Sequence, residues 1–120
     1  MRFICCVALS AISASAVTTN VWKGAASGGT WSDQANWTEP LTPTVATVYD
    51  FSKLEDGAKV VNDYVRVKTS AEQLRIEGLI FGENKGTITL EGASDSETIF
   101  SKKSFFDVPS GTVFDCRLRH

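Results

Sequence analysis

The sequence predicts an all-β fold, and three observations support this prediction. First, no apolar stripe with a period of 3.6 residues persists for three helical turns anywhere in the chain. Second, short runs rich in valine, isoleucine, threonine and phenylalanine recur, several of them with a period of two. Third, glycine, proline or polar turn residues separate these runs. The runs are therefore expected strands, and the segments between them are expected turns.

The clearest of these expected strands is residues 87–90, where two apolar side chains alternate with two threonines. Ile88 and Leu90 point to one face, and Thr87 and Thr89 point to the other. Other runs follow the same rule less regularly. In chain order, the expected strands are residues 45–51, 60–67, 74–76, 79–81, 87–90, 99–100, 105–108 and 112–118.

The spacing of the expected strands leaves two architectures open. The runs recur about every 10 to 15 residues, which is typical both of a small antiparallel β-sandwich and of a stack of solenoid coils. In a solenoid we expect the coil interior to contain Ile76, Leu79, Phe81, Ile88, Leu90 and Ile99. A solenoid of this size would also expose its C-terminal coil, and self-association through that open end is expected.

The first 16 residues have the layout of a secretory signal peptide. Arg2 gives a short positive region, residues 3–12 are largely apolar, and Ala14 and Ala16 flank Ser15 in a cleavage pattern. The apolar run is too short for a membrane-spanning helix, which needs about 20 residues. We therefore expect export to the cell surface or the extracellular space, with the periplasm crossed in transit. Residues 17–120 are expected to form one domain without a transmembrane segment.

The charge and cysteine content of the expected mature chain exclude several classes of protein. Removal of residues 1–16 leaves 11 basic and 14 acidic side chains, a net charge of −3 with histidine neutral. This balance argues against a nucleic-acid partner, which needs a basic face. Cys116 is the one cysteine left, so an internal disulfide is excluded. It is interpreted as a buried inert thiol, an intermolecular partner, or part of a chain that continues further.

Catalytic and metal-binding residues are not evident. His120, the sole histidine, is the last residue, so a nucleophile triad has no credible base, and zinc would need more Cys and His ligands. Two pairs, Asp95 with Glu97 and Glu55 with Asp56, could in principle cleave glycosides, and an acidic group could in principle bind calcium. We interpret these acids as solvated turn residues and predict no enzyme, no metal and no cofactor. The acidic group considered for calcium is Asp50, Glu55, Asp56 and Asp63.

Three tryptophans, Trp22, Trp31 and Trp37, are the strongest candidates for a ligand site. If they were exposed, their indoles could stack on sugar rings. The alternative, which we favour, is that they cover the end of a solenoid within a tryptophan- and glycine-rich N-terminal cap, residues 17–44. Asn36 begins a glycosylation pattern with Trp37 and Thr38, but we expect it to stabilise a turn.

A family resemblance is carried by the tryptophan segment and two glycine-bounded strands. The tryptophan segment reads VWKG at 21–24, SGGTWSD at 27–33 and ANW at 35–37, with Pro40 and Pro43 following. The strands read IEGLIF at 76–81 and GTITLEG at 86–92. These motifs resemble autotransporter-associated β-strand repeat proteins, which are large exported bacterial proteins similar to autotransporter passengers.

The resemblance implies a right-handed parallel β-helix, with residues 45–120 forming its coils and the tryptophan segment at its N-terminal end. Because such proteins are usually much longer, the chain is expected to be an N-terminal portion that breaks off within the solenoid. The implied function is a non-catalytic structural or cell-surface module with adhesive contacts to glycans or proteins. Two alternatives stay open: a carbohydrate-binding module that uses the tryptophans, and the leader segment of a larger polysaccharide-degrading β-helix enzyme.

Overall fold

A computed structural model describes residues 17–64, 73–83 and 85–119, and this part of the chain forms eight β-strands and one short 3-10 helix. Strand content dominates, so the all-β prediction is confirmed. In chain order, the elements are β1 Thr19–Val21, β2 Gly28–Thr30, η3 Gln34–Asn36, β3 Thr47–Asp50, β4 Lys59–Asn62, β5 Leu74–Ile80, β6 Gly86–Gly92, β7 Thr98–Asp107 and β8 Thr112–Arg117.

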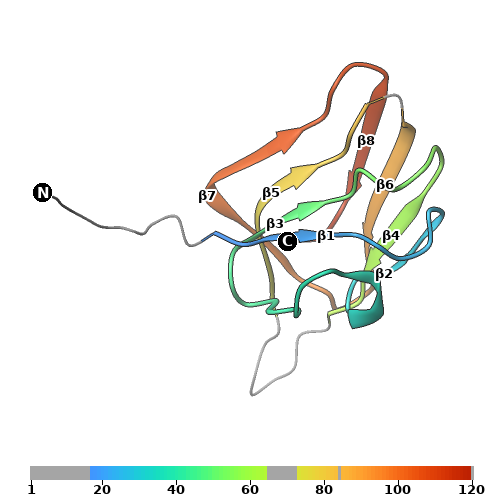
Figure 1. Ribbon diagram of the computed structural model, residues 1–120. Coiled ribbons are helices and arrows are strands. Elements are labelled where there is room, and N and C mark those ends of the chain that lie inside the picture. Colours follow the sequence, from blue (N-terminus) through green and yellow to red (C-terminus); the bar gives the residue numbers. More distant parts are fainter. Residues whose placement is uncertain (1–16, 65–72, 84, 120) are drawn as a thin grey trace, which may run out of the picture.

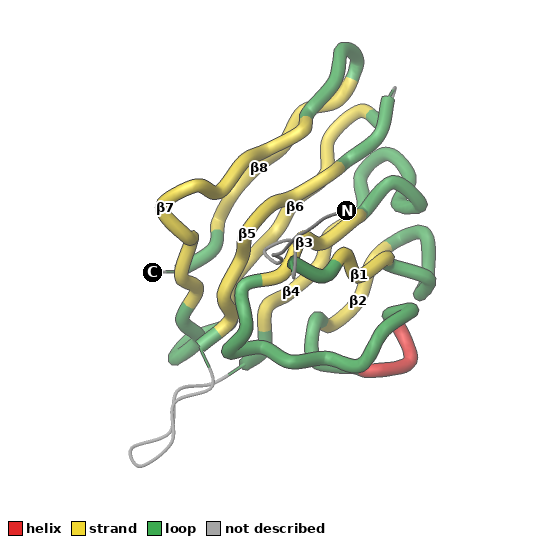
Figure 2. Tube along the Cα trace, turned by 60° about the vertical axis from the view of Figure 1, so that its left-hand side comes forward, coloured by secondary structure: helices red, strands yellow, loops and turns green. Residues whose placement is uncertain are grey.

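The strands form two parallel sheets that face each other (Figures 1 and 2). One sheet has the order β1-β3-β5-β7 and the other has the order β2-β4-β6-β8. Each coil of the chain therefore adds one strand to each sheet, and the coils stack as a β-solenoid of about three turns. Every ladder between neighbouring strands is parallel, so the alternative of an antiparallel β-sandwich is wrong.

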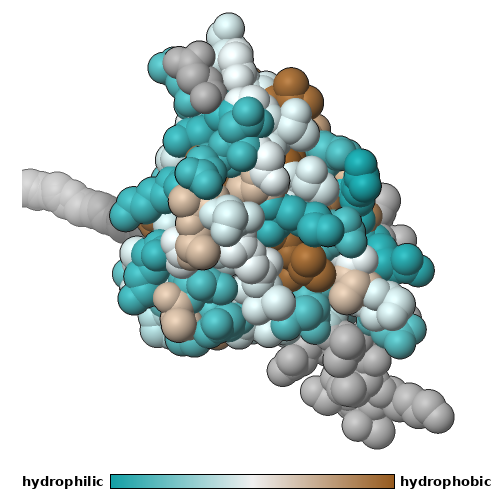
Figure 3. Space-filling view, turned by 90° about the vertical axis from the view of Figure 1, so that its right-hand side faces the viewer, coloured by the Kyte–Doolittle hydropathy of each residue, from teal (hydrophilic) through white to brown (hydrophobic). Residues whose placement is uncertain are grey.

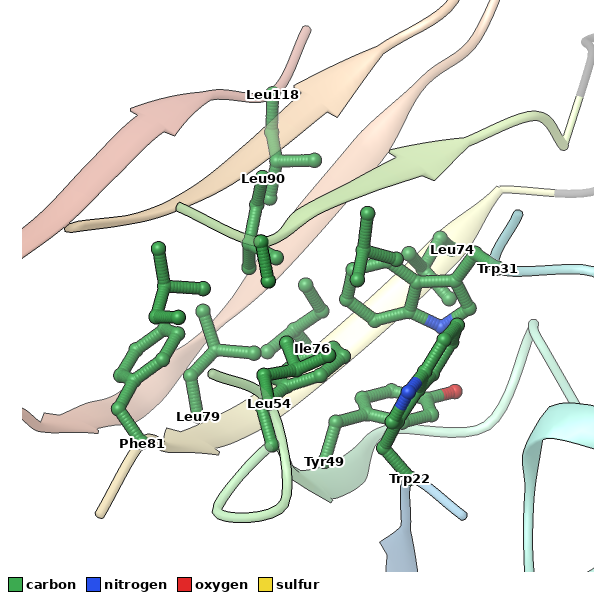
Figure 4. Packing of buried hydrophobic residues seen from close by; sticks show 14 of the residues in the cluster. Trp22, Trp31, Tyr49, Leu54, Leu74, Ile76, Leu79, Phe81, Leu90 and Leu118 are labelled. Carbon is green, nitrogen blue, oxygen red and sulfur yellow. The ribbon is translucent and has the colours of Figure 1, made fainter. Parts of the chain in front are cut away.

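The hydrophobic core lies between the two sheets and runs from coil to coil (Figure 4). Because strands pair in register, one inward position repeats in each coil: Tyr49 lies beside Leu79, and Val60 lies beside Leu90. All four of these side chains are buried. Five of the six predicted interior residues are fully buried, namely Ile76, Leu79, Phe81, Ile88 and Leu90.

The sixth predicted interior residue, Ile99, is wrong. In β7 it pairs with Arg75, on the outer side of the sheet, and it is only half-buried. Its neighbours take the inward positions: Thr98 is buried and pairs with Leu74, while Phe100 packs against the core. The threonine begins the strand on the inner side, and the period of two then places the isoleucine outside.

Strand β7 also joins two runs that the sequence separates, residues 99–100 and 105–108. Between them, the pairing with β5 steps from Ile76 with Phe100 to Gly78 with Phe105, so residues 101–104 bulge out of the ladder. Strand β4 ends at Asn62, residues 63 and 64 of the expected run 60–67 are not in a strand, and residues 65–67, with Val65 and Val67, lie outside the described residues.

Candidate functional site

The three predicted site tryptophans come together in the first coil, inside the core, and Figure 4 shows Trp22 and Trp31 there. Trp22 and Trp31 are fully buried, and Trp37 is 1% exposed. Their rings pack mainly edge to face with one another and with two further aromatics. The Trp22 and Trp37 centroids are 5.2 Å apart, and Trp31 lies 4.9 Å from Tyr49 and 5.2 Å from Phe51. Edge-to-face contacts at these distances are favourable beyond the burial of area.

Hydrogen bonds fix two of the indoles. Trp37 Nε1 donates to the Trp31 carbonyl oxygen at 2.7 Å, and Trp22 Nε1 donates to the Ala25 carbonyl oxygen at 3.0 Å. Trp31 Nε1 is buried and makes no hydrogen bond of normal geometry, although the Trp31 side chain interacts with the Tyr49 hydroxyl. Because none of the three indoles has an exposed face, the stacking surface that a carbohydrate-binding site would need is absent from this cluster.

The free edge of β1 is covered by the segment 36–39, which begins at the last residue of η3. Lys23 N donates to the Asn36 carbonyl oxygen at 2.7 Å, and Thr38 N donates to the Val21 carbonyl oxygen at 3.0 Å. Trp22 and Trp37 form an isolated antiparallel bridge along the same edge. The N-terminal end of this sheet is therefore closed by the chain's own backbone, which removes an edge that could pair with other strands.

Asn36 contributes to this closure through its side chain. Its Nδ2 donates to the Thr30 carbonyl oxygen at 3.0 Å, at the end of β2. A Cβ on Gly24 would collide with the Asn36 side-chain amide, so the glycine makes room for it. The amide therefore ties the end of β2 to η3.

The opposite end of the solenoid is different, because β7 and β8 have no described strand on their outer edges (Figure 1, orange and red). We call this surface, which is formed by β7 and β8, the open end. Phe106 occupies the inward position next to Leu79, yet it is 50% exposed. Phe114 is only half-buried, although it pairs with the fully buried Ile88.

Aromatic contacts link the open end to the core beneath it. Phe106 lies 5.5 Å from Phe100 and 5.6 Å from Phe114, measured between ring centroids. Phe114 in turn lies 4.6 Å from Phe81, which is fully buried. Core-type side chains thus continue into the coil of β7 and β8, and no further strand covers them within the described residues. Cores of this kind are normally closed by a cap or by a partner.

Charged and polar groups frame the open end. Lys102 and Lys103 are exposed in the bulge of β7. On the outer face of β8, Arg117 donates to Asp115 Oδ2 from Nη2 at 2.9 Å, and this bond raises the pKa of the guanidinium. Cys116, between these two residues, is a free and exposed thiol.

Three of the acidic residues considered for calcium or glycoside cleavage accept hydrogen bonds from backbone N–H groups. The Asp50 carboxylate accepts from Ser52 N at 2.8 Å, Asp56 accepts from Thr87 N at 3.1 Å, and Asp63 accepts from Ser32 N at 2.9 Å. The Asp50 contact stabilises a turn, whereas the other two each link segments 31 residues apart in the chain. Within residues 17–64, 73–83 and 85–119, no three His, Cys, Asp or Glu side chains gather in a way that could hold a metal ion.

Figure 3 shows the side of the molecule that lies to the right in Figure 1. It is mostly hydrophilic, and its hydrophobic residues form small separate groups. In the described part of the chain, no helix is long and apolar enough to cross a membrane. Comparison with models of protein families, with curated proteins and with solved structures finds no match for this chain.

The sequence predicts strands at the residues of the open end, but it does not predict that these strands are exposed. The alternation in residues 112–118 places Phe114, Cys116 and Leu118 on one face. In the structure, Phe114 pairs with the buried Ile88 of β6, so this face points inward. Their importance depends on β8 being an outermost strand, which alternation alone does not show. Phe106 was within an expected strand, but its inward direction depends on the bulge that precedes it.

Proposed function

We propose that this chain is an exported, non-catalytic structural or surface-interaction module that works through contacts made at its open end. The observation that carries the proposal is the difference between the covered edge of β1 and the uncovered edges of β7 and β8. The edge of β1 is covered by the segment 36–39, whereas β7 and β8 present uncovered core-type side chains and unpaired backbone. Uncovered apolar side chains beside an unpaired strand edge are typical of a contact surface.

Export is the second part of the proposal, and the sequence of residues 1–16 supports it. The resemblance to autotransporter-associated β-strand repeat proteins supports the same placement, because those proteins are exported and resemble surface-displayed passengers. A solenoid module in that setting would act by displaying its coils and by binding neighbours at the cell surface.

Binding of a hydrophobic fluorescent dye tests the contact surface. Phe106→Lys places a charge on the open end, while Val45→Lys makes the same change in the loop before β3, at a residue with matched exposure, 54% against 50%. We expect Phe106→Lys to lose most of the dye fluorescence and to raise the solubility limit, and Val45→Lys to change neither. Equal dye binding in the two variants would contradict a contact surface at the open end.

Export is tested separately by expressing the full chain in a bacterium and sequencing the N-terminus of the product. We expect a mature chain that begins at Val17 and is found outside the cytoplasm. A product that keeps residues 1–16 and stays in the cytoplasm would contradict export, without bearing on the contact surface.

A further inference from the structure

We propose that the partner of the open end is a second copy of this chain, paired through antiparallel β8 strands related by a twofold axis at Cys116. This inference rests on the proposed function, because it names the partner of the same surface. It is drawn from four features of the last coil: the two strand edges, the charges of β8, its inward side chains and the exposed thiol.

The edges of β7 and β8 are not equally ready to pair. In β7, residues 101–104 interrupt the ladder, and Lys102 and Lys103 project there into solvent. Bulges and lysines on an outer strand are devices that block pairing with other strands. Strand β8 has neither, since Thr112–Arg117 pairs with β6 without a register shift and contains no lysine. The edge available for a partner is therefore that of β8.

A twofold axis perpendicular to β8 reverses the strand direction, so two copies would meet antiparallel, the more stable way to pair. When the axis passes through Cys116, each Asp115 lies opposite Arg117 of the second copy. These two side chains share the outer face of β8, where they already form an ion pair within one copy. Two copies thus bring together four charges of alternating sign, so the strand is complementary to itself in this register.

The inner face of β8 is complementary in the same register. Phe114 of one copy lies opposite Leu118 of the other, so apolar side chains meet on both sides of the axis. Phe114 is only half-buried within one copy, and its pairing with Ile88 places it on the side that faces the core. Leu118 is buried within its own copy, so the cover for the Phe114 ring would come from the two paired strand edges. A shift of the register by one residue would place apolar side chains of one copy against the charged face of the other.

The thiol lies on the axis itself. Cys116 is exposed, and in this register it faces Cys116 of the second copy. Directly opposite residues of antiparallel strands have Cα atoms about 4.5 to 5.5 Å apart, which overlaps the range that a disulfide requires. The thiol is therefore a reporter of the pairing. Without a covalent link we expect a weak dimer, because a six-residue strand gives an interface at the small end of specific contacts.

Oxidation under a defined thiol–disulfide buffer tests the pairing. The full chain carries Cys5→Ser and Cys6→Ser so that Cys116 is its sole thiol, and oxidised glutathione is the oxidant. Two Cys116 thiols give up two protons and two electrons to form one disulfide, and one oxidised glutathione is reduced to two thiols. The matched control moves the thiol along the same strand, as Cys116→Ser with Val113→Cys, to an exposed residue that would not face its own copy.

We expect the Cys116 chain to form a covalent dimer, which is measured by intact mass without reductant. Its equilibrium ratio of dimer to glutathione adduct should be at least about tenfold higher than that of the control. Buried tryptophan emission, which reports the first coil, should be the same in both chains. An equal ratio in the two chains would overturn the proposal.

Charge exchange tests the register. In the Asp115→Arg variant, residues 115 and 117 are both basic, and in the Arg117→Asp variant they are both acidic. A homodimer of either variant would therefore place like charges opposite each other. We expect each variant to lose its homodimer by about tenfold, and an equimolar mixture to form mainly the mixed dimer. Homodimers at the original level, or a mixture without enrichment of the mixed dimer, would overturn the register. If the dye still binds at Phe106 while these dimers are absent, the open end binds a different partner and the proposed function stands.

Discussion

Replacing Trp37 with phenylalanine is expected to destabilise the fold more than the same replacement of Trp31. Both indoles are essentially fully buried in the same aromatic cluster, so both variants lose similar apolar area and leave a similar cavity. From the cost of large-to-small substitutions in cores, we estimate this shared loss at about 2 kcal/mol.

The difference between the two variants lies in their hydrogen bonds. Trp37 Nε1 donates to the Trp31 carbonyl oxygen at 2.7 Å, in a buried site. Trp37→Phe removes this donor, and a buried acceptor left without its partner costs about 1 to 3 kcal/mol. The Trp31 side chain makes no hydrogen bond of normal geometry and interacts only weakly with the Tyr49 hydroxyl, so Trp31→Phe is expected to lose less polar stabilisation than Trp37→Phe.

Urea unfolding followed by far-ultraviolet circular dichroism measures the difference, because it does not depend on the indoles as the probe. We expect Trp37→Phe to be less stable than Trp31→Phe by about 1 to 3 kcal/mol with equal m-values. For a domain of about 100 residues this corresponds to a melting temperature lower by roughly 5 to 15 °C. Equal stabilities, or a less stable Trp31→Phe variant, would refute the role assigned to the Trp37 hydrogen bond.

Two further substitutions test other parts of the fold. Gly28 has φ +106°, and a Cβ there would meet the backbone carbonyl of Lys59, so Gly28→Ala should lower the free energy of unfolding by about 3 kcal/mol or more. Gly57 has φ +82° with open space around it, so Gly57→Ala should lower it by only about 1 to 2 kcal/mol. Equal denaturation midpoints would contradict the close approach of β2 to β4. Burial raises the pKa of Tyr49, so the folded state keeps its proton when the unfolded chain begins to lose it, and stability should fall as the pH rises above about 10. Tyr49→Phe should flatten this alkaline loss in urea titrations at a series of pH values, and an unchanged slope would show that other groups cause it.

The coil interior could be predicted because it depends on local alternation. Ile88 and Leu90 are separated by threonine, and this pattern is the same whichever strands lie beside it. Alternation does not distinguish parallel from antiparallel neighbours, however, which is why the sandwich remained open until the sheets were seen. The error at Ile99 has the same origin, because the phase of β7 is set by its pairing with β5 and not by its own residues.

The candidate site was less predictable than the core. The tryptophans were recognised as a group, but whether Trp31 faces solvent or the interior depends on Tyr49 and Phe51, which lie far along the chain. The open end was expected for a solenoid, yet the residues that form it were not identified. The exposure of Phe106 follows from its place in an outermost strand, and strand order is a long-range property that single-sequence patterns do not contain.

Hydrogen–deuterium exchange at two protein concentrations tests most directly whether one end of the solenoid is closed and the other open. We expect amides in residues 20–23 and 36–39 to be protected at both concentrations, because the segment 36–39 covers the edge of β1. Peptides covering β8 should exchange faster at low concentration and gain protection at high concentration as a second copy pairs with them. Equal protection at the two ends, with no change in β8 as the concentration rises, would contradict an open end that acts as the contact surface.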